Sequence, residues 1–270
     1  MRPLNVIFTG GVQVLFLVCF SSLDIIWAIP GIIGLMLLVA SGNAINDYYD
    51  RTADWFNRPD TLILERHLQP KVGWLVFMVG ATAGIALGWQ QGPLMGWTYV
   101  IIASALWLYS RYLKRLPLIG NLWVASLLTL PLLVWCLWPQ SVDCEAAIRY
   151  GVVVWSINAL RELVKDQQDA DGDRQAHFHT MPVVSPRWTR YIGHGLFGLT
   201  YLTLLGLLQW TFSSQQHFLW FMSILLGIFI PLLYLHFIWH HSHSPRQWKA
   251  IQHMLKILMA VGTLTLAWGC

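Results

Sequence analysis

The sequence predicts an all-α protein that crosses a membrane several times. Hydrophobic residues make up 56% of the 270 residues, and charged residues only 11%. Apolar runs of nearly twenty residues recur along the chain, and a helix of that length crosses a hydrocarbon core of about 30 Å. Polar backbone groups inside lipid must be hydrogen-bonded within their own segment, so each run is expected to be a helix. We therefore predict a bundle of nine transmembrane helices that forms one integral membrane domain over residues 1–270.

Each apolar run defines one expected span. The first run begins at Leu4 and lacks a clear small-residue cleavage site, so we interpret it as a transmembrane helix rather than a signal peptide. No linker rich in Pro, Gly or Ser separates the runs, which favours a single domain. In chain order, the expected spans cover residues 4–20, 25–45, 72–89, 94–110, 118–138, 146–165, 188–209, 216–239 and 250–269.

The basic residues indicate how the bundle is oriented. Fifteen of the 17 Lys and Arg residues lie at the N-terminus or in the loops after the second, fourth, sixth and eighth spans, whereas only Arg149 lies on the opposite side. Basic residues accumulate on the cytoplasmic side of membrane proteins. We therefore expect a cytoplasmic N-terminus in a bacterial or archaeal cell membrane. The net charge of +4 is attributed to this topology rather than to nucleic-acid binding.

Two short acidic segments stand out in a chain that is otherwise poor in charge. NDYYDRTAD follows the second span, and KDQQDADGD follows the sixth. Each segment holds three aspartates at offsets of three and then four residues, which places them on one face of a helix. Mg²⁺ offsets the repulsion between such carboxylates and also binds phosphate oxygens, so two facing sets would clamp a diphosphate on the cytoplasmic side, with Asn46 as a neutral ligand. The sets are Asp47, Asp50 and Asp54, and Asp166, Asp169 and Asp173.

Two other interpretations of the acidic segments stay open. One segment alone is typical of a solvated helix end, and only its repetition favours a metal site. A cation or solute transporter could use intramembrane carboxylates to carry ions. Transport predicts acidic residues near the middle of the spans, whereas these residues cluster just beyond the ends of two spans on the expected cytoplasmic side.

The motifs resemble those of the UbiA superfamily of intramembrane prenyltransferases. The family signature N-D-x-x-D-x-x-x-D matches residues 46–54, and the related motif of the second half matches residues 166–173. RELVKD at 161–166, YSRYLKRLPLIGN at 109–121 and HTMPV at 179–183 are also similar to family sequences. The second motif is closest in form to the branch that contains geranylgeranylglyceryl-phosphate, chlorophyll and homogentisate prenyltransferases.

The resemblance implies transfer of a prenyl group from a prenyl diphosphate to a membrane-soluble acceptor, through an allylic carbocation and with Mg²⁺. The internal near-repeat suggests two half-repeats around a central cavity, each with one acidic motif. The expected metal ligands are Asn46, Asp50, Asp54, Asp166, Asp169 and Asp173. The expected catalytic residues are Asp47, Asp50, Asp54, Lys114, Asp166, Asp169 and Asp173. Cations that stabilise the leaving group and aromatic rings that stabilise the allylic cation complete the substrate site, which is expected to contain Asn46, Tyr48, Tyr49, Arg58, Tyr109, Arg115, Arg161 and Lys165.

The sequence favours one class of acceptor over another. We expect a lipid of the geranylgeranylglyceryl phosphate type and a long prenyl donor. The alternative is a quinone precursor of the hydroxybenzoate or naphthoate type. After the first motif, the family usually has N-R-P-x-R-P-L-P-S-G, whereas this chain has NRPDTLILERHL at residues 57–68, which also leaves an inactive scaffold as an alternative. The oligomeric state and the role of the histidines between His236 and His243 stay open.

Overall fold

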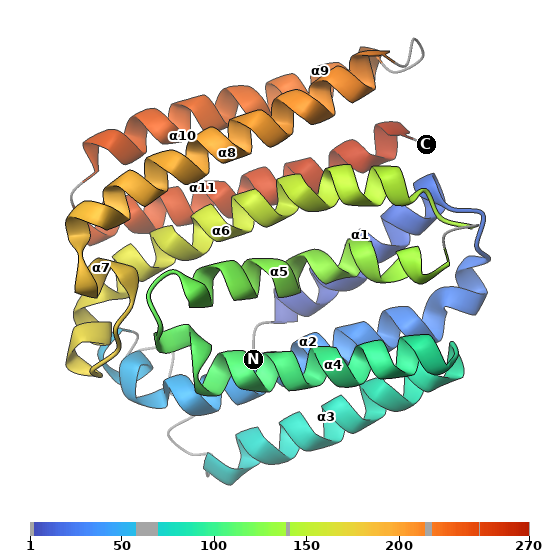
Figure 1. Ribbon diagram of the computed structural model, residues 1–270, viewed down its shortest axis with the longest axis horizontal. Coiled ribbons are helices and arrows are strands. Elements are labelled where there is room, and N and C mark those ends of the chain that lie inside the picture. The colour runs from blue at the N-terminus through green and yellow to red at the C-terminus, as the bar shows by residue number, and fades with distance from the viewer. Residues whose placement is uncertain (1–2, 58–69, 139–140, 214–217, 243, 270) are drawn as a thin grey trace.

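Long helices that run side by side along one direction make up the structure, which is a computed structural model (Figure 1). It describes residues 3–57, 70–138, 141–213, 218–242 and 244–269, and the side chains of residues 52–57, 70 and 213 lie outside the described set. Helices labelled η are 3-10 helices, except η4, which is a π-helix. The elements are α1 (Pro3–Phe20), α2 (Ile25–Asn57), α3 (Pro70–Gln90), α4 (Pro93–Arg111), η2 (Leu113–Arg115), α5 (Ile119–Leu133), η3 (Val134–Leu137), α6 (Cys144–Gln175), α7 (Met181–Val184), α8 (Pro186–Ser213), α9 (Phe218–Ile224), η4 (Leu225–Phe229), α10 (Ile230–His241), α11 (Pro245–Leu264) and η5 (Thr265–Gly269).

Seven helical stretches of the described chain are long and apolar enough to cross a membrane. They lie in α1, α2 and α3, in α5 with η3, in α8, in α9 with η4 and α10, and in α11 with η5. The prediction of an all-α, multi-pass membrane protein is thereby confirmed. The two other spans expected from the sequence, at 94–110 and 146–165, correspond to α4 and α6.

Helices α2 and α6 continue well past the spans expected for them. The sequence predicts that these spans end near residues 45 and 165, whereas the helices run to Asn57 and Gln175 and contain 33 and 32 residues. The additional turns contain the two acidic motifs. Each motif is therefore part of a regular helix, and its aspartates share one helix face, as their offsets require.

Both acidic motifs lie at the same end of the bundle. On the left of Figure 1 lie the last turns of α2, the η2 turn and the connection from α6 to α7, and α10 ends on the same side. At the other end, the turn after α1 meets the turn before α6. Backbone hydrogen bonds of 2.8 Å run there from Ser22 N to Ser141 O and from Asp143 N to Phe20 O. The fold thus gathers the polar segments at one end.

Helix α6 is the centre of the packing and contacts α2, α5, α8 and α11. Its middle turns are fully buried, as at Leu160 and Leu163. Helices α2 and α3 approach closely where Gly34 faces Gly84, since a Cβ on Gly84 would lie 2.7 Å from the carbonyl oxygen of Gly34. Small residues allow such close contact between helix backbones. This contact fixes how α2, and with it the first motif, is placed.

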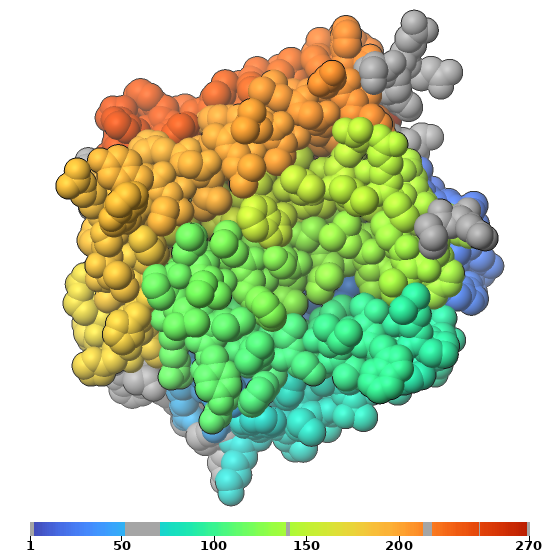
Figure 2. Space-filling view, viewed as in Figure 1, coloured from blue at the N-terminus to red at the C-terminus, as the bar shows by residue number. Residues whose placement is uncertain are grey.

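The outer surface of the bundle is largely apolar. Large hydrophobic side chains such as Ile101, Leu202 and Phe237 are exposed on α4, α8 and α10. Figure 2 shows α4, α5, α6 and α8 side by side on one face. Apolar exposure on this scale is expected of helices that contact lipid, because burial in hydrocarbon replaces burial in a protein core.

Candidate active site

The first acidic motif lies in the last turns of α2. Asn46 and Asp50 are one helical turn apart, and Nδ2 of Asn46 donates a hydrogen bond of 2.6 Å to Oδ2 of Asp50. Both residues are buried, and Asp47 is partly buried. The side chain of Asp54 lies outside the described residues. The hydrogen bond from Asn46 holds the Asp50 carboxylate in one orientation.

The second acidic motif lies near the C-terminal end of α6, where other segments orient two of its carboxylates. Asn121 of α5 donates from Nδ2 to Oδ2 of Asp166 at 2.8 Å. Thr180, which precedes α7, donates from Oγ1 to Oδ2 of Asp173 at 3.0 Å. Asp169 lies between them on the same helix face and is partly buried. The motif is therefore positioned by tertiary contacts on both sides.

The two oriented carboxyl groups are weaker acids than usual. Burial raises the pKa of Asp166 to about 7, although the hydrogen bond from Asn121 and the charge of Lys165 lower it. Burial likewise raises the pKa of Asp173 to about 6, although the hydrogen bond from Thr180 lowers it. A buried carboxylate is costly to ionise unless an opposite charge lies nearby. The electrostatics of the second motif therefore favour binding of a cation.

Lys114 connects the two motifs. It lies in η2, between α4 and α5, and its Nζ forms an ion pair with Oδ2 of Asp50. Burial raises the pKa of Asp173 on α6, and the charge of Lys114 partly offsets that rise. The ammonium group therefore acts on one carboxylate from each motif. Segments far apart in the sequence meet at this side chain.

The donor set suits a hard divalent cation that arrives with a phosphate-bearing ligand. Across the described part of the chain, no three His, Cys, Asp or Glu side chains form a group that could hold a metal ion by themselves. Mg²⁺ commonly binds through only one or two carboxylates, with waters and substrate phosphates completing its ligands. The buried Oδ1 of Asn46 has no hydrogen-bond partner, and it is an oxygen of the kind that Mg²⁺ prefers. The residues present thus fit the predicted cofactor.

Two of the expected substrate-binding cations, Arg161 and Lys165, lie deeper along α6. Both pair with Glu162: Nη2 of Arg161 contacts Oε1, and Nζ of Lys165 lies 3.6 Å from Oε2. A third, Arg115, lies over the ring of Phe178 at 4.8 Å from its centroid. Lys114 pairs directly with an aspartate of the motifs. In contrast, Arg161 and Lys165 pair with Glu162, and Arg115 contacts the ring of Phe178.

The expected tyrosines belong to the packing at this end of the bundle. Tyr48 and Tyr49 meet edge to face with ring centroids 4.9 Å apart. The hydroxyl oxygen of Tyr49 accepts a hydrogen bond of 3.1 Å from Nη1 of Arg111. Tyr109 is buried. Arg58 and the unusual loop at residues 58–68 lie outside the described residues.

The comparison with protein families follows almost the whole bundle. Residues 6–259 match the model of the UbiA prenyltransferase family. The chain belongs to this family. Among its relatives, the digeranylgeranylglyceryl phosphate synthase of Natronomonas pharaonis is 30% identical over 223 residues, which cover 78% of this chain and 79% of the relative. The resemblance seen in the motifs is confirmed, and with it the assignment as a prenyltransferase.

Solved structures share the UbiA fold. A structure from work on digeranylgeranylglyceryl phosphate synthase in membranes has a TM-score of 0.77 at 19% identity, and the match covers 99% of this chain and 95% of that chain. A UbiA homologue from Archaeoglobus fulgidus, bound to GPP and Mg²⁺, has a TM-score of 0.69 at 15% identity, again over 99% and 95% of the two chains. At these identities, the similarity shows the fold alone.

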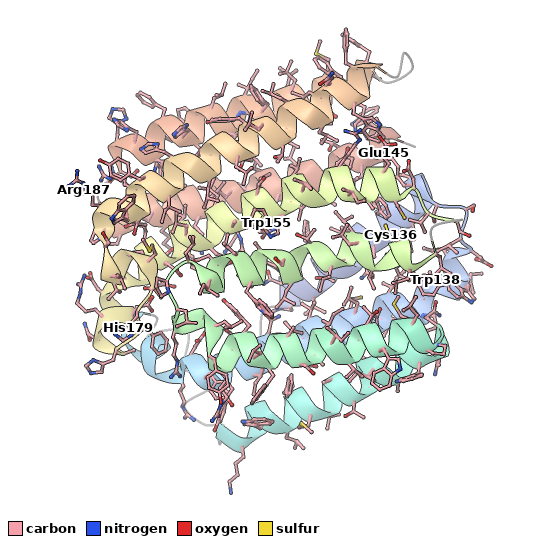
Figure 3. All side chains as sticks on the ribbon, viewed as in Figure 1. Cys136, Trp138, Glu145, Trp155, His179 and Arg187 are labelled. Atoms are coloured by element: carbon pink, nitrogen blue, oxygen red, sulfur yellow. The ribbon has the colours of Figure 1, made fainter. Side chains whose placement is uncertain are left out.

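Several residues of this UbiA site are absent from the sequence predictions. Asn121 and Thr180 orient the second motif, and Glu162 pairs with the two deeper cations. All three lie within family-like stretches of the sequence, at 109–121, 179–183 and 161–166, so a signal for them existed. Figure 3 shows His179, the neighbour of Thr180, at the end of the bundle that holds the acidic motifs.

The histidine cluster forms a contact between α8 and α10. Nε2 of His236 lies 2.7 Å from Nδ1 of His194, and Nδ1 of His236 lies 3.0 Å from the hydroxyl oxygen of Tyr201. His243 lies outside the described residues. These hydrogen bonds join two helices, and the described histidines form no group that could hold a metal ion.

Proposed function

We propose that this UbiA-family enzyme transfers a long prenyl group from a prenyl diphosphate to a glycerol-phosphate lipid, of the geranylgeranylglyceryl phosphate type, in the membrane. The observation that carries the proposal is the position of Lys114, which pairs with Asp50 and acts on Asp173. Carboxylates of both motifs around one positive charge suit a diphosphate that binds with divalent cations. Relatives named digeranylgeranylglyceryl phosphate synthase support this class of acceptor.

The residues that would hold Mg²⁺ belong to the two motifs. When bound, Mg²⁺ offsets the negative charge that develops on the leaving diphosphate. The A. fulgidus homologue with GPP and Mg²⁺ supports the same cofactor here. We assign the ligands as Asn46, Asp50, Asp54, Asp166, Asp169 and Asp173.

The chain's own residues prepare the site before substrate binds. Asn121 and Thr180 hold two carboxylates in place, so less freedom is lost when the diphosphate arrives. Lys114 balances the charge of Asp50 and Asp173. With diphosphate bound, its ammonium group would contact the diphosphate oxygens and stabilise the charge that forms on them.

The other residues expected from the sequence keep their proposed roles. Asp47 completes the catalytic set. We also propose that α4 and α6 span the membrane, which gives nine spans in one domain over residues 1–270, and that the N-terminus and the acidic end face the cytoplasm. The basic residues of the alternate loops support this orientation. The remaining substrate site comprises Tyr48, Tyr49, Arg58, Tyr109, Arg115, Arg161 and Lys165.

The test is prenyl transfer by the purified chain in lipid vesicles, from radiolabelled geranylgeranyl diphosphate. Geranylgeranylglyceryl phosphate and hydroxybenzoate are offered separately, each with Mg²⁺ or with EDTA. We expect Mg²⁺-dependent label in the glycerol-phosphate lipid. Label in hydroxybenzoate alone would place the enzyme with the quinone-precursor prenyltransferases. If neither acceptor is labelled and the donor does not bind, the proposal is wrong.

A further inference from the structure

A buried charged residue lies one helical turn deeper in the bundle than the second acidic motif. Glu162 precedes Asp166 by four residues, so it lies on the same face of α6, about 6 Å further from the helix end. Burial is the main cause of the raised pKa of Asp166, and the charge of Glu162 adds to it. Glu162 therefore extends the acidic face of α6 toward the middle of the bundle.

Two cations hold Glu162 in place. Arg161 and Lys165 pair with its two carboxylate oxygens. The side chains of Arg161, Lys165 and Glu162 are only 14%, 11% and 7% exposed. Together they carry one net positive charge, and Lys165 also acts on the carboxylates of Asp166 and Asp173. Because charges removed from water are costly unless balanced, the two cations can bind an anionic group as well as Glu162.

Two buried polar atoms close to Glu162 on α6 have no hydrogen-bond partner among the described residues. They are Oδ1 of Asn158 and Nε of Arg161. Asn158 is completely buried one turn before Glu162, and Arg161 is the neighbour of Glu162 in sequence. Native proteins pair nearly all such atoms, so two unpaired atoms beside Glu162 indicate a ligand site.

From these contacts, and resting on the function proposed above, we infer that Glu162 accepts the proton of the acceptor hydroxyl and that the surrounding groups bind the acceptor head group. The net positive charge of the Arg161, Glu162 and Lys165 cluster matches a phosphate monoester. Nε of Arg161, which has no hydrogen-bond partner among the described residues, can donate to an oxygen of the head group. The cluster also lies inward of the acidic motifs, on the side toward which an isoprenoid chain must extend to reach apolar surroundings.

The transfer needs a group that removes this proton. The bond between C1 of the prenyl group and the bridging oxygen breaks, and its electron pair stays on the diphosphate. The acceptor oxygen forms the new bond to C1, while its O–H bond breaks and the proton passes to the Glu162 carboxylate. A protonated ether is a strong acid, so a carboxylate paired with two cations is basic enough to accept this proton. The proton then leaves to solvent.

The experiment separates donor binding from transfer in Glu162→Gln. This substitution keeps the side-chain shape but replaces the proton acceptor with an amide. We expect transfer from geranylgeranyl diphosphate to geranylgeranylglyceryl phosphate to fall about 100-fold or more, the usual contribution of a general base. The dissociation constant of Mg²⁺ with geranylgeranyl thiolodiphosphate, which resists ionisation, is expected to stay within about twofold. Glu162→Asp retains a carboxylate and is expected to transfer at least tenfold faster than Glu162→Gln.

Glu145→Gln provides a matched control. It makes the same chemical change on the same helix, at the end away from His179 (Figure 3), and it is expected to leave transfer unchanged. The double variant Arg161→Gln, Glu162→Gln removes both members of an ion pair and serves if the single variant does not fold, and its comparison with Arg161→Gln alone isolates the loss of transfer due to Glu162. Transfer within tenfold of wild type in the folded glutamine variants would overturn the inference, as would a parallel loss of donor binding. Absence of transfer in wild type would instead reject the proposed function.

Discussion

Lys114 and Asp50 lie 64 residues apart in the sequence, and they form an ion pair at the end of the bundle that holds both acidic motifs. The pair places a fixed positive charge among carboxylates that otherwise repel one another. Its charge also reaches Asp173, which belongs to the other motif. An internal ammonium group and a divalent cation therefore compete for the same negative charge.

Replacing Lys114 by Met is expected to change metal and donor binding in opposite directions. In the absence of donor, the carboxylates of the variant are expected to bind Mg²⁺ about tenfold more tightly, because one competing positive charge has been removed. Prenyl diphosphate binds more weakly, because a cation that faces its oxygens is lost. Titration calorimetry with each ligand measures both changes. Lys249→Met, at an exposed position on α11, is the control, and unchanged affinity for both ligands in Lys114→Met would contradict the assigned role.

Asp173 and Asp171 offer a matched pair of substitutions. Asp173 is buried and accepts a hydrogen bond from Thr180, whereas the side chain of Asp171 is 82% exposed and pairs with Arg174 at 3.2 Å. Asp173→Asn is expected to reduce Mg²⁺-dependent transfer by about 100-fold or more, since one charged ligand is lost. Asp171→Asn is expected to retain wild-type transfer. Equal activity of the two variants in the vesicle assay would argue against the second motif as the metal site.

Binding of Mg²⁺ is expected to weaken as the pH falls from about 8 to 6. Burial raises the pKa of Asp166 to about 7 and that of Asp173 to about 6. Both groups must lose a proton before they bind a cation, so acid competes with the metal through this window and metal binding releases protons. Calorimetry in buffers of different ionisation enthalpy measures the number of protons released. A metal affinity that is constant between pH 6 and 8 would be inconsistent with these two ligands.

Asn121→Ala is expected to shift this pH dependence upward. The amide of Asn121 lowers the pKa of Asp166 through its hydrogen bond, against the effect of burial. Without that bond the carboxyl group keeps its proton to a higher pH, so the midpoint for Mg²⁺ binding rises. Transfer at neutral pH is expected to fall by about tenfold, the effect of one lost hydrogen bond to a charged group. A midpoint that does not move would show that Asn121 does not orient Asp166 in the bound state.

The contact between His194 and His236 is expected to affect stability rather than transfer. Their hydrogen bond joins α8 to α10, and Tyr201 bonds to the second nitrogen of His236. His236→Phe keeps an aromatic ring and removes both hydrogen bonds, so it is expected to destabilise the bundle by about 1 kcal/mol. Thermal unfolding in detergent measures this loss, and the vesicle assay serves as its control. A large loss of transfer with unchanged stability would connect this cluster to catalysis.

The sequence predicts much of the fold and the chemical class of the site. Helices α2 and α6 show where that prediction stops. Their apolar parts define spans, but the turns that carry Asp50 and Asp173 are polar, and hydropathy does not indicate that the helices continue through them. Asn121 illustrates a second limit. It lies in a family-like stretch of the sequence, but that stretch does not indicate that the amide reaches Asp166 on another helix.

Hydropathy and the spacing of the aspartates, by themselves, determined that the chain is a multi-pass membrane protein with two acidic helix faces, and the resemblance of its motifs to the UbiA family supplied the prenyltransferase assignment. Both are local properties: a run of apolar residues fixes a span, and offsets of three and four fix a helix face. Only the tertiary structure decided that Lys114 meets Asp50 and that Glu162 is buried between Arg161 and Lys165. Such contacts depend on the rotation and height of each helix against its neighbours. Those quantities are set by close packing across the whole bundle, as where Gly34 meets Gly84.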